Sequence, residues 1–310
     1  MYDVIIIGGG PGGVAAGVYA ARKKMKTAII ADTVGGQSVI SVDIQNWIGT
    51  PSISGFEFSQ ALERHLRAQK DDIDIVDGER AETIEKLSDG TFRVTTNSKK
   101  VFETKTILLT IGSRHRRLEI PGEKDFEGHG VVYCATCDAP LFKGKEVAVV
   151  GGGNSGLEAV VDLLPYATKI YLIHRGESLK GDKSTQDKIV QKPNVEIILN
   201  AAPREIHGEG KLVSELVYEN IITGEKKILK VQGVFVETGV QPNSEIVKNL
   251  VKLSEWNSII INPQTQETSC PGIWAAGDVT NALYRQNNIS AGDAIKAILN
   301  IYDHLHIKGK

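Results

Sequence analysis

The chain has 310 residues, of which 41% are apolar and 24% charged, and its net charge at pH 7 is −2. This length suits two domains, and the composition is that of an ordinary soluble globular protein. The small net charge creates no field that would attract nucleic acid or an anionic membrane. No apolar run approaches the ~20 residues needed to cross a bilayer, and the first residues lack the pattern of a signal peptide. We therefore expect a cytoplasmic protein with neither nucleic-acid nor membrane partners.

The N-terminal segment predicts a β-α-β unit around a glycine-rich turn. Its strand, helix and second strand are expected at residues 4–7, 12–24 and 27–31. The turn fits G-x-G-x-x-G, in which the glycines allow a tight turn, close approach of a pyrophosphate and close packing of helix on strand. These glycines are Gly8, Gly10 and Gly13, with Pro11 and Gly12 between them. The unit therefore predicts a dinucleotide whose phosphates lie at the N-terminus of the helix.

An acidic residue follows the second predicted strand. In dinucleotide-binding units, a carboxylate about ~20 residues after the glycines bonds a ribose hydroxyl. Asp32 lies 19 residues after Gly13. A solvated turn residue is an equally good interpretation of Asp32, so both stay open.

The pattern then continues and restarts. A helix at 53–69, strands within 73–110 and a crossing at 113–123 precede a second β-α-β unit, whose elements span 146–150, 156–164 and 169–173. Further strands within 193–240, a second crossing at 241–243, strands at 259–261 and 273–276, and a helix at 291–305 follow. This internal repeat predicts an α/β fold with two Rossmann-like dinucleotide-binding domains of three ββα layers, one inserted in the other. The domains would be residues 1–112 plus 245–310, and residues 113–244.

The second glycine fingerprint predicts a second dinucleotide. It comprises Gly151, Gly153 and Gly156, with Asn154 and Ser155 inside it. FAD and a nicotinamide cofactor form the economical pair, because a flavin can accept a hydride and reduce a disulfide. After the following strand stand His174 and Arg175, where Arg175 could pair with a 2′-phosphate and Lys180 could assist. These side chains favour NADPH over NADH, although plain surface charges remain the alternative.

Two of the three cysteines, Cys134 and Cys137, form a Cys-x-x-Cys pair. In a cytosolic chain such a pair indicates a redox-active disulfide or a metal site. Structural zinc needs four ligands, and only Cys270 and scattered histidines remain, so we favour the redox pair and predict no metal. Cys270 itself is expected to be a buried structural thiol. Asp138 could shuttle a proton to the leaving thiol or cap a helix.

These motifs together resemble the low-molecular-weight thioredoxin reductases, which are class II pyridine nucleotide-disulfide oxidoreductases, over essentially the whole chain. The most specific element is the run Cys-Ala-Thr-Cys-Asp at 134–138 between two dinucleotide fingerprints. Other matching segments are Gly35-Gly36-Gln37, Asn46-Trp47, Gly277-Asp278, Arg285-Gln286 and Ser290-Ala291-Gly292. The resemblance implies a homodimeric enzyme that passes electrons from NADPH through FAD and the cysteine pair to a thioredoxin-like protein.

The resemblance also implies the roles of individual residues. Residues 1–112 plus 245–310 would bind FAD, and residues 113–244 would bind the nicotinamide cofactor. Cys137 would receive electrons from the flavin, Cys134 would attack the partner's disulfide, and Asp138 would be the general acid. Further candidate contacts to FAD are Gly35, Gly36, Gln37, Asn46, Gly112, Gly277, Asp278, Arg285 and Gln286.

Departures from this family leave the donor and the partner open. Thioredoxin reductases usually carry His-Arg-Arg, three residues and Arg, whereas this chain has His174-Arg175-Gly176 and then Lys180, with Glu177 between them. The second fingerprint and residues 139–145 also resemble the flavoprotein component of alkyl hydroperoxide reductase, without its N-terminal domain. The alternatives are therefore NADH or ferredoxin as electron donor, a peroxidase system as the acceptor, or a flavin-binding redox sensor without steady turnover.

Overall fold

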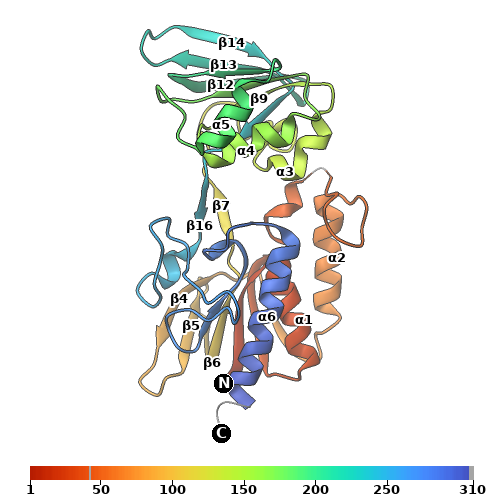
Figure 1. Ribbon diagram of the computed structural model, residues 1–310. Helices are drawn as coiled ribbons and strands as arrows, with labels where there is room; N and C mark the ends of the chain where they lie inside the picture. Colours follow the sequence, from red (N-terminus) through yellow and green to blue (C-terminus); the bar gives the residue numbers. More distant parts are fainter. Residues whose placement is uncertain (42, 307–310) are drawn as a thin grey trace. The chain divides into compact units, whose positions relative to one another are not determined.

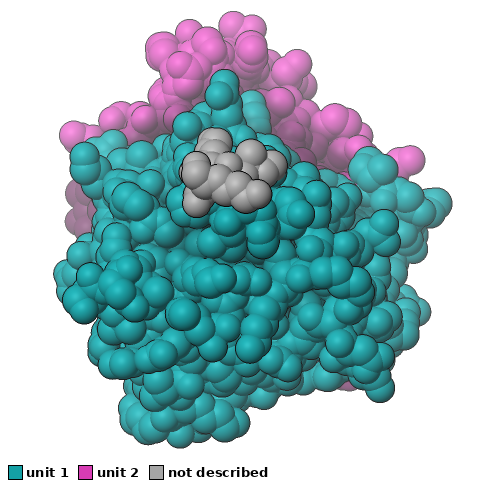
Figure 2. All heavy atoms as spheres, turned by 90° about the horizontal axis from the view of Figure 1, so that it is seen from below, with its two compact units in different colours: residues 1–39, 47–114, 241–310 teal, residues 40–46, 115–240 magenta. Residues whose placement is uncertain are grey.

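The computed structural model describes residues 1–41 and 43–306 and contains two compact units (Figures 1 and 2). Unit 1 comprises residues 1–39, 47–114 and 241–310, and unit 2 comprises residues 40–46 and 115–240. The chain passes between them twice, and the connecting strands β7 (Ser113–His115) and β16 (Val240–Pro242) pair with each other. Among the described residues, no helix combines the length and apolar character needed to cross a membrane.

Unit 1 is built on a sheet in which parallel and antiparallel strands meet at β6. In sheet order its strands are β3 (Ile73–Asp77), β2 (Thr27–Val34), β1 (Tyr2–Gly9), β6 (Val101–Leu109), β5 (Phe92–Thr96) and β4 (Ala81–Lys86), with β17 (Ile273–Ala275) also on β6. The first half of β6 pairs antiparallel with β5, and its second half pairs parallel with β17. One long strand therefore serves both a parallel sheet and an antiparallel one.

The helices of unit 1 cover one face of the parallel strands. They are α1 (Pro11–Arg22), α2 (Gly55–Arg67) and α6 (Asn287–His306), with short 3-10 turns at Gly36–Ile40, Ser244–Val247 and Gly277–Val279. Helix α2 is shorter than the predicted 53–69, because Ser54 and Glu57 form a reciprocal capping box that starts it at Gly55.

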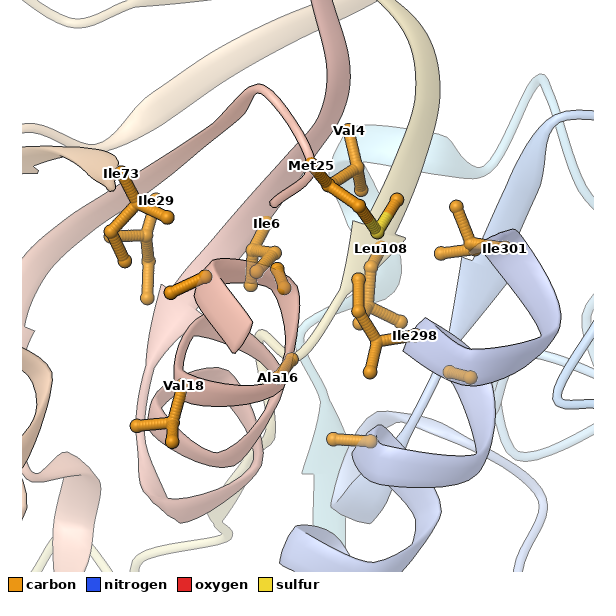
Figure 3. Close-up of a cluster of buried hydrophobic side chains, with 14 of the residues drawn as sticks. Val4, Ile6, Ala16, Val18, Met25, Ile29, Ile73, Leu108, Ile298 and Ile301 are labelled. Atoms are coloured by element: carbon orange, nitrogen blue, oxygen red, sulfur yellow. The ribbon is translucent and has the colours of Figure 1, made fainter. Parts of the chain in front are cut away.

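Two hydrophobic cores lie on opposite faces of the unit 1 sheet. On the helix side, Ile6 packs with residues of α1 and α6 such as Ala16 and Ile298 (Figure 3). On the other side, Ile5 packs with Phe92 of the antiparallel strands. Because successive side chains of a strand alternate between faces, β1 must be apolar throughout. This explains the uninterrupted apolar run seen in the sequence and confirms the three-layer arrangement.

Unit 2 repeats this architecture. Its parallel sheet has the order β11 (Val195–Ile198), β10 (Lys169–Ile173), β9 (Glu146–Val150), β15 (Gly233–Val236) and β8 (Val131–Val132). A second, antiparallel sheet contains β12 (Ala201–Glu209), β13 (Leu212–Asn220) and β14 (Lys226–Lys230). The helices are α3 (Ala135–Asp138), α4 (Asn154–Leu163) and α5 (Lys183–Val190), with a 3-10 turn at Ala139–Phe142. The predicted α/β fold with an internal repeat is confirmed.

One predicted element is wrong. Residues 259–261 do not form a strand; Ile259 and Ile261 make only isolated bridges to separate segments. The side chain of Ile259 is fully buried in the core on the antiparallel side of unit 1. Its apolar neighbours therefore reflect burial of a loop and not a sheet ladder.

Candidate functional site: two glycine loops and a redox-active disulfide

The first glycine loop connects β1 to α1, and the packing explains its third glycine. A Cβ on Gly13 would lie 1.8 Å from the carbonyl oxygen of Gly8, so any side chain there would separate the helix from the strand. Around Gly10, by contrast, the nearest atom to such a Cβ is 3.8 Å away, at Gly36. Gly10 caps the N-terminus of α1 without a side-chain hydrogen bond. The amides of the first helical turn are thus available to an anionic ligand.

A cavity of about 840 Å³ opens in front of this loop, entirely within unit 1. This volume lies in the upper part of the range for small-molecule sites. The predicted FAD residues that line it are Gly8, Gly10, Pro11, Gly12, Asp32, Gly36, Gln37, Gly112, Gly277 and Asp278. The structure therefore brings together residues that are spread from the first strand to the last.

Other predicted FAD residues do not line the cavity. Gly13 and Gly35 lie in the packing around the loop, where Gly35 faces Ser59 of α2. Arg285 and Gln286 precede α6 and lie outside the lining, and Asn46 belongs to unit 2. Several lining residues were missed by the sequence analysis: Thr33, Ser38, Glu79, Arg80, Glu82, Thr110, Arg114, Asn243, Glu245, Asn287 and Ser290. The second crossing at 241–243 was the only signal that pointed to Asn243.

The polar groups at one side of this cavity suit a cofactor with hydroxyl and phosphate groups. Asp278 accepts a hydrogen bond from Ser290 Oγ at 3.3 Å. Burial raises the pKa of the Asp278 carboxyl, while the charge of Arg285 and the bond from Ser290 act in the opposite direction. Among the described residues, the Nε atom of Arg285 is buried and has no partner. Together with the open helix N-terminus, these groups fit a bound FAD.

The second glycine loop connects β9 to α4 and repeats the packing of the first. A Cβ on Gly156 would lie 1.8 Å from the carbonyl oxygen of Gly151, whereas one on Gly153 would meet nothing within 4 Å. The loop is tied to the segment that carries the predicted phosphate ligands. The amide of Lys180 donates to the carbonyl oxygen of Gly152 at 2.8 Å, and the amide of Asp182 donates to Asn154 Oδ1 at 2.7 Å.

His174 ends β10 beside this loop and is only 9% exposed. Burial, and next the positive charges of Lys180 and Arg175, lower the pKa of its imidazole. In the described part of the chain its Nε2 atom has no hydrogen-bond partner. A Cβ on Gly176 would lie 2.8 Å from this Nε2 atom. The departure from His-Arg-Arg at residue 176 thus has a packing reason: the imidazole occupies the space that a side chain would need.

Cys134 and Cys137 are joined by a disulfide, with their Cα atoms 5.3 Å apart. Cys134 caps the four-residue helix α3, and Cys137 lies inside it. Burial raises the pKa of the adjacent Asp138 carboxyl to about 7. Neither α3 nor the turn after it receives a side-chain cap, so the alternative of Asp138 as a helix cap is wrong. Cys270 is a free, buried thiol in unit 1, as predicted.

A residue that the sequence analysis missed also contacts the disulfide helix. Glu237 directly follows β15, and its Oε1 atom accepts a hydrogen bond from the amide of Ala135 at 3.4 Å. Burial raises the pKa of this carboxyl to about 8. No motif pointed to Glu237, because it lies about a hundred residues from the cysteine pair in sequence and only the parallel sheet brings it there.

Comparison with known proteins supports this description. A family model described as pyridine nucleotide-disulphide oxidoreductase matches residues 2–296. The flavoprotein AhpF, a component of alkyl hydroperoxide reductase, of Xanthomonas campestris pv. phaseoli is 40% identical over 305 residues, and a protein of Bacillus subtilis called NADH dehydrogenase is 38% identical over 304 residues. These alignments cover 98% of this chain but 57% and 58% of the relatives, so the chain spans little more than half of their length.

Solved structures match the chain over its whole length. Thioredoxin reductase from Streptococcus pyogenes superposes with a TM-score of 0.91 at 34% identity and covers 98% of both chains. Thioredoxin reductase from Giardia duodenalis has the same TM-score at 29% identity and covers 99% of both chains. The resemblance inferred from the motifs is thus confirmed. With its two glycine loops and its disulfide, the chain belongs to the pyridine nucleotide-disulphide oxidoreductase family.

Proposed function

We propose that the chain is a thioredoxin-type disulfide reductase, which passes electrons from a reduced nicotinamide cofactor through FAD to the Cys134–Cys137 disulfide and on to a thioredoxin-like protein. The observation that carries this proposal is the disulfide on a short helix beside a carboxyl with a pKa of about 7. The match to thioredoxin reductases over the whole chain supports it. A homodimer and a cytoplasmic location stay predictions.

In this proposal unit 1 holds FAD in the cavity of about 840 Å³. The amides at the start of α1 would bind the pyrophosphate, Asp32 a ribose hydroxyl, and Asp278 the ribityl chain or phosphates. Bound FAD would supply the chemistry that links a hydride donor to a disulfide. The protein's own groups then handle the protons: Asp138 holds a proton near neutral pH and delivers it to a sulfur as the disulfide opens.

We propose NADPH as the donor, bound at the second glycine loop. Arg175 and Lys180 both act electrostatically on His174, so their positive charges gather at the end of β10. Within the described residues neither forms an ion pair, which leaves both available to a 2′-phosphate. Gly176 cannot supply the second arginine of the family pattern, so two cations and not three would bind the phosphate.

Anaerobic titration of the flavin absorbance with NADPH, NADH and reduced ferredoxin tests the donor. We expect NADPH to bleach the flavin band at micromolar concentration. The Arg175→Ala variant should raise the KM for NADPH roughly 10- to 100-fold, since a hydrogen bond to a charged group contributes about 1.5–3 kcal/mol. Its kcat and its KM for NADH should change little. Bleaching by NADH or ferredoxin but not by millimolar NADPH would contradict the proposal.

The similarity to the alkyl hydroperoxide reductase flavoprotein favours a second candidate acceptor, a peroxidase of the peroxiredoxin type. Steady-state reduction of thioredoxin, of a peroxiredoxin and of the reagent DTNB separates the two. Turnover with the peroxiredoxin alone would identify the peroxidase system. Reduction of the flavin without turnover of any acceptor would instead indicate a redox sensor.

A further inference from the structure

The disulfide helix is held from two sides by carboxyl groups. On one side, Glu237 Oε1 accepts the amide hydrogen of Ala135, the residue between the two cysteines that follows Cys134 directly. On the other side, Thr136 Oγ1 donates to Asp162 Oδ2 of α4 at 2.8 Å. Both contacts are made to residues inside the Cys-x-x-Cys turn. A change in the charge of Glu237 therefore acts directly on the segment that carries the reacting sulfurs.

The charged groups that face Glu237 from its neighbouring elements are all acidic. They are Asp138 at the end of α3, and Glu158 and Asp162 on α4. Burial is the main reason why the pKa of Glu237 rises to about 8, and these three carboxyls add to it. Since Asp138 has a pKa of about 7, both carboxyls nearest the turn are protonated over much of the neutral range.

Opening the disulfide adds negative charge at this place. Two electrons break the Cys134–Cys137 bond, and two protons are needed to form two thiols; with fewer protons, a thiolate remains. A thiolate beside Glu237 disfavours its ionised form, just as the neighbouring carboxyls do. The carboxyl of Glu237 therefore binds its proton more tightly after reduction than before, and this difference is linked to the reduction equilibrium.

We propose that Glu237 is a positioning residue that couples reduction of the Cys134–Cys137 disulfide to binding of a proton at its own carboxyl, acting through the amide of Ala135 and through Asp138. The balanced step at alkaline pH is disulfide plus two electrons plus three protons, which yields two thiols and a neutral Glu237 carboxyl. Below that range Glu237 already carries its proton, and only two protons enter. The inference rests on the proposed function, because it assigns a redox role to this disulfide.

The equilibrium between the disulfide and dithiothreitol tests this coupling. Dithiothreitol supplies both electrons and both thiol protons, so the reference reaction is independent of pH while its thiols stay protonated. The reduced fraction is measured between pH 6.5 and 8.8 by quenching, alkylating and counting modified cysteines by mass, with Cys270 as an internal constant. The wild-type equilibrium constant should fall as the pH rises above about 8, approaching tenfold per pH unit for one extra proton.

The Glu237→Gln variant keeps the shape and the acceptor of the side chain but cannot ionise. Its equilibrium constant should equal that of the wild type at pH 6.5 and exceed it at least threefold at pH 8.8. A purely structural role would shift the constant equally at every pH. Glu158→Gln is the matched control, because it removes one acidic group of the same cluster from an exposed position. We expect less than a twofold change in this control at any pH.

A ratio of variant to wild type that is flat with pH, or an equal rise in Glu158→Gln, would overturn the inference. If Glu237→Gln does not fold, the Asp138→Asn variant replaces it: there Glu237 alone is left to titrate, and the equilibrium constant must still fall above about pH 8. Because dithiothreitol exchange needs neither donor nor partner protein, the outcome is separable from the proposed function. Loss of thioredoxin turnover with the pH-dependent ratio intact would reject the partner and leave Glu237's role standing.

Discussion

At the scale of single residues, Asp138 is the group whose surroundings matter most for chemistry. Its carboxyl lies beside the disulfide, and burial raises its pKa to about 7, from the usual value near ~3.9. A carboxylic acid with this pKa can deliver a proton at neutral pH and be reprotonated between turnovers. The amino acid type alone would predict a carboxylate that is ionised long before neutrality.

The Asp138→Asn variant should therefore reduce DTNB and thioredoxin roughly 100-fold more slowly at pH 7, because general acid catalysis contributes about 10²–10⁴-fold. Wild-type turnover should fall as the pH rises through about 7, and this fall should be absent in the variant. Flavin reduction by the donor should be unchanged. Glu158→Gln is the control, and equal losses in both variants would show that only the charge of the helix face was disturbed.

The same raised pKa predicts how the stability depends on pH. The neutral form of Asp138 is favoured in the folded protein, so its contribution to stability is complete at low pH and is lost as the pH rises through about 7. Between pH 5 and pH 8.5, denaturant unfolding should show a smaller loss of stability in Asp138→Asn than in the wild type. A larger loss in the variant would mean that the carboxylate is stabilised by a partner and not disfavoured by burial.

At the scale of elements, the two β-α turns separate packing from ligand binding within one motif. In the second loop, Gly156 meets a carbonyl oxygen at 1.8 Å from its virtual Cβ, while Gly153 faces open space. Gly156→Ala should destabilise the protein by about 1–3 kcal/mol, the typical effect of overpacking. Gly153→Ala should leave stability within about 0.5 kcal/mol but weaken nicotinamide binding, because its methyl group would occupy the approach of the pyrophosphate.

Thermal unfolding and binding of NADPH, measured on both variants, check this division. Equal destabilisation by the two substitutions would contradict it. A normal affinity of Gly153→Ala for the nucleotide would show that the second loop does not hold the pyrophosphate. The structurally equivalent Gly10 of the first loop provides the same comparison for FAD.

At the scale of the whole molecule, each unit has its own pair of cores around its own parallel sheet. Cofactor binding should therefore stabilise the units separately. Excess FAD at about 100 times its Kd adds about 2.7 kcal/mol to the free energy of unfolding of the unit that binds it. In calorimetry of the apoprotein, FAD should move one transition upward and leave the remainder in place, and Asp278→Asn should reduce the shift. An equal shift of the entire profile would indicate that the units unfold as one.

Much of this could be predicted from local pattern. The glycine fingerprints, the apolar strands that precede them and the repeat of the β-α-β unit depend on short-range rules of turn geometry and burial. The cysteine pair also lies within four residues. By contrast, the lining residues Glu79 and Asn243 carry no motif of their own, and Gly176 looked like a defect in the phosphate segment until the imidazole of His174 was seen in the space beside it.

The sequence by itself determined the fold class, the two dinucleotide loops and the redox pair, because each of these follows from residues that are neighbours in the chain. The tertiary structure alone decided the electrostatics of the redox pair. The pKa of Asp138 depends on how deeply α3 is buried, and the contact of Glu237 depends on β15 lying beside β9 in the parallel sheet. Burial and charge proximity are sums over groups that are distant in sequence, so no local pattern contains them.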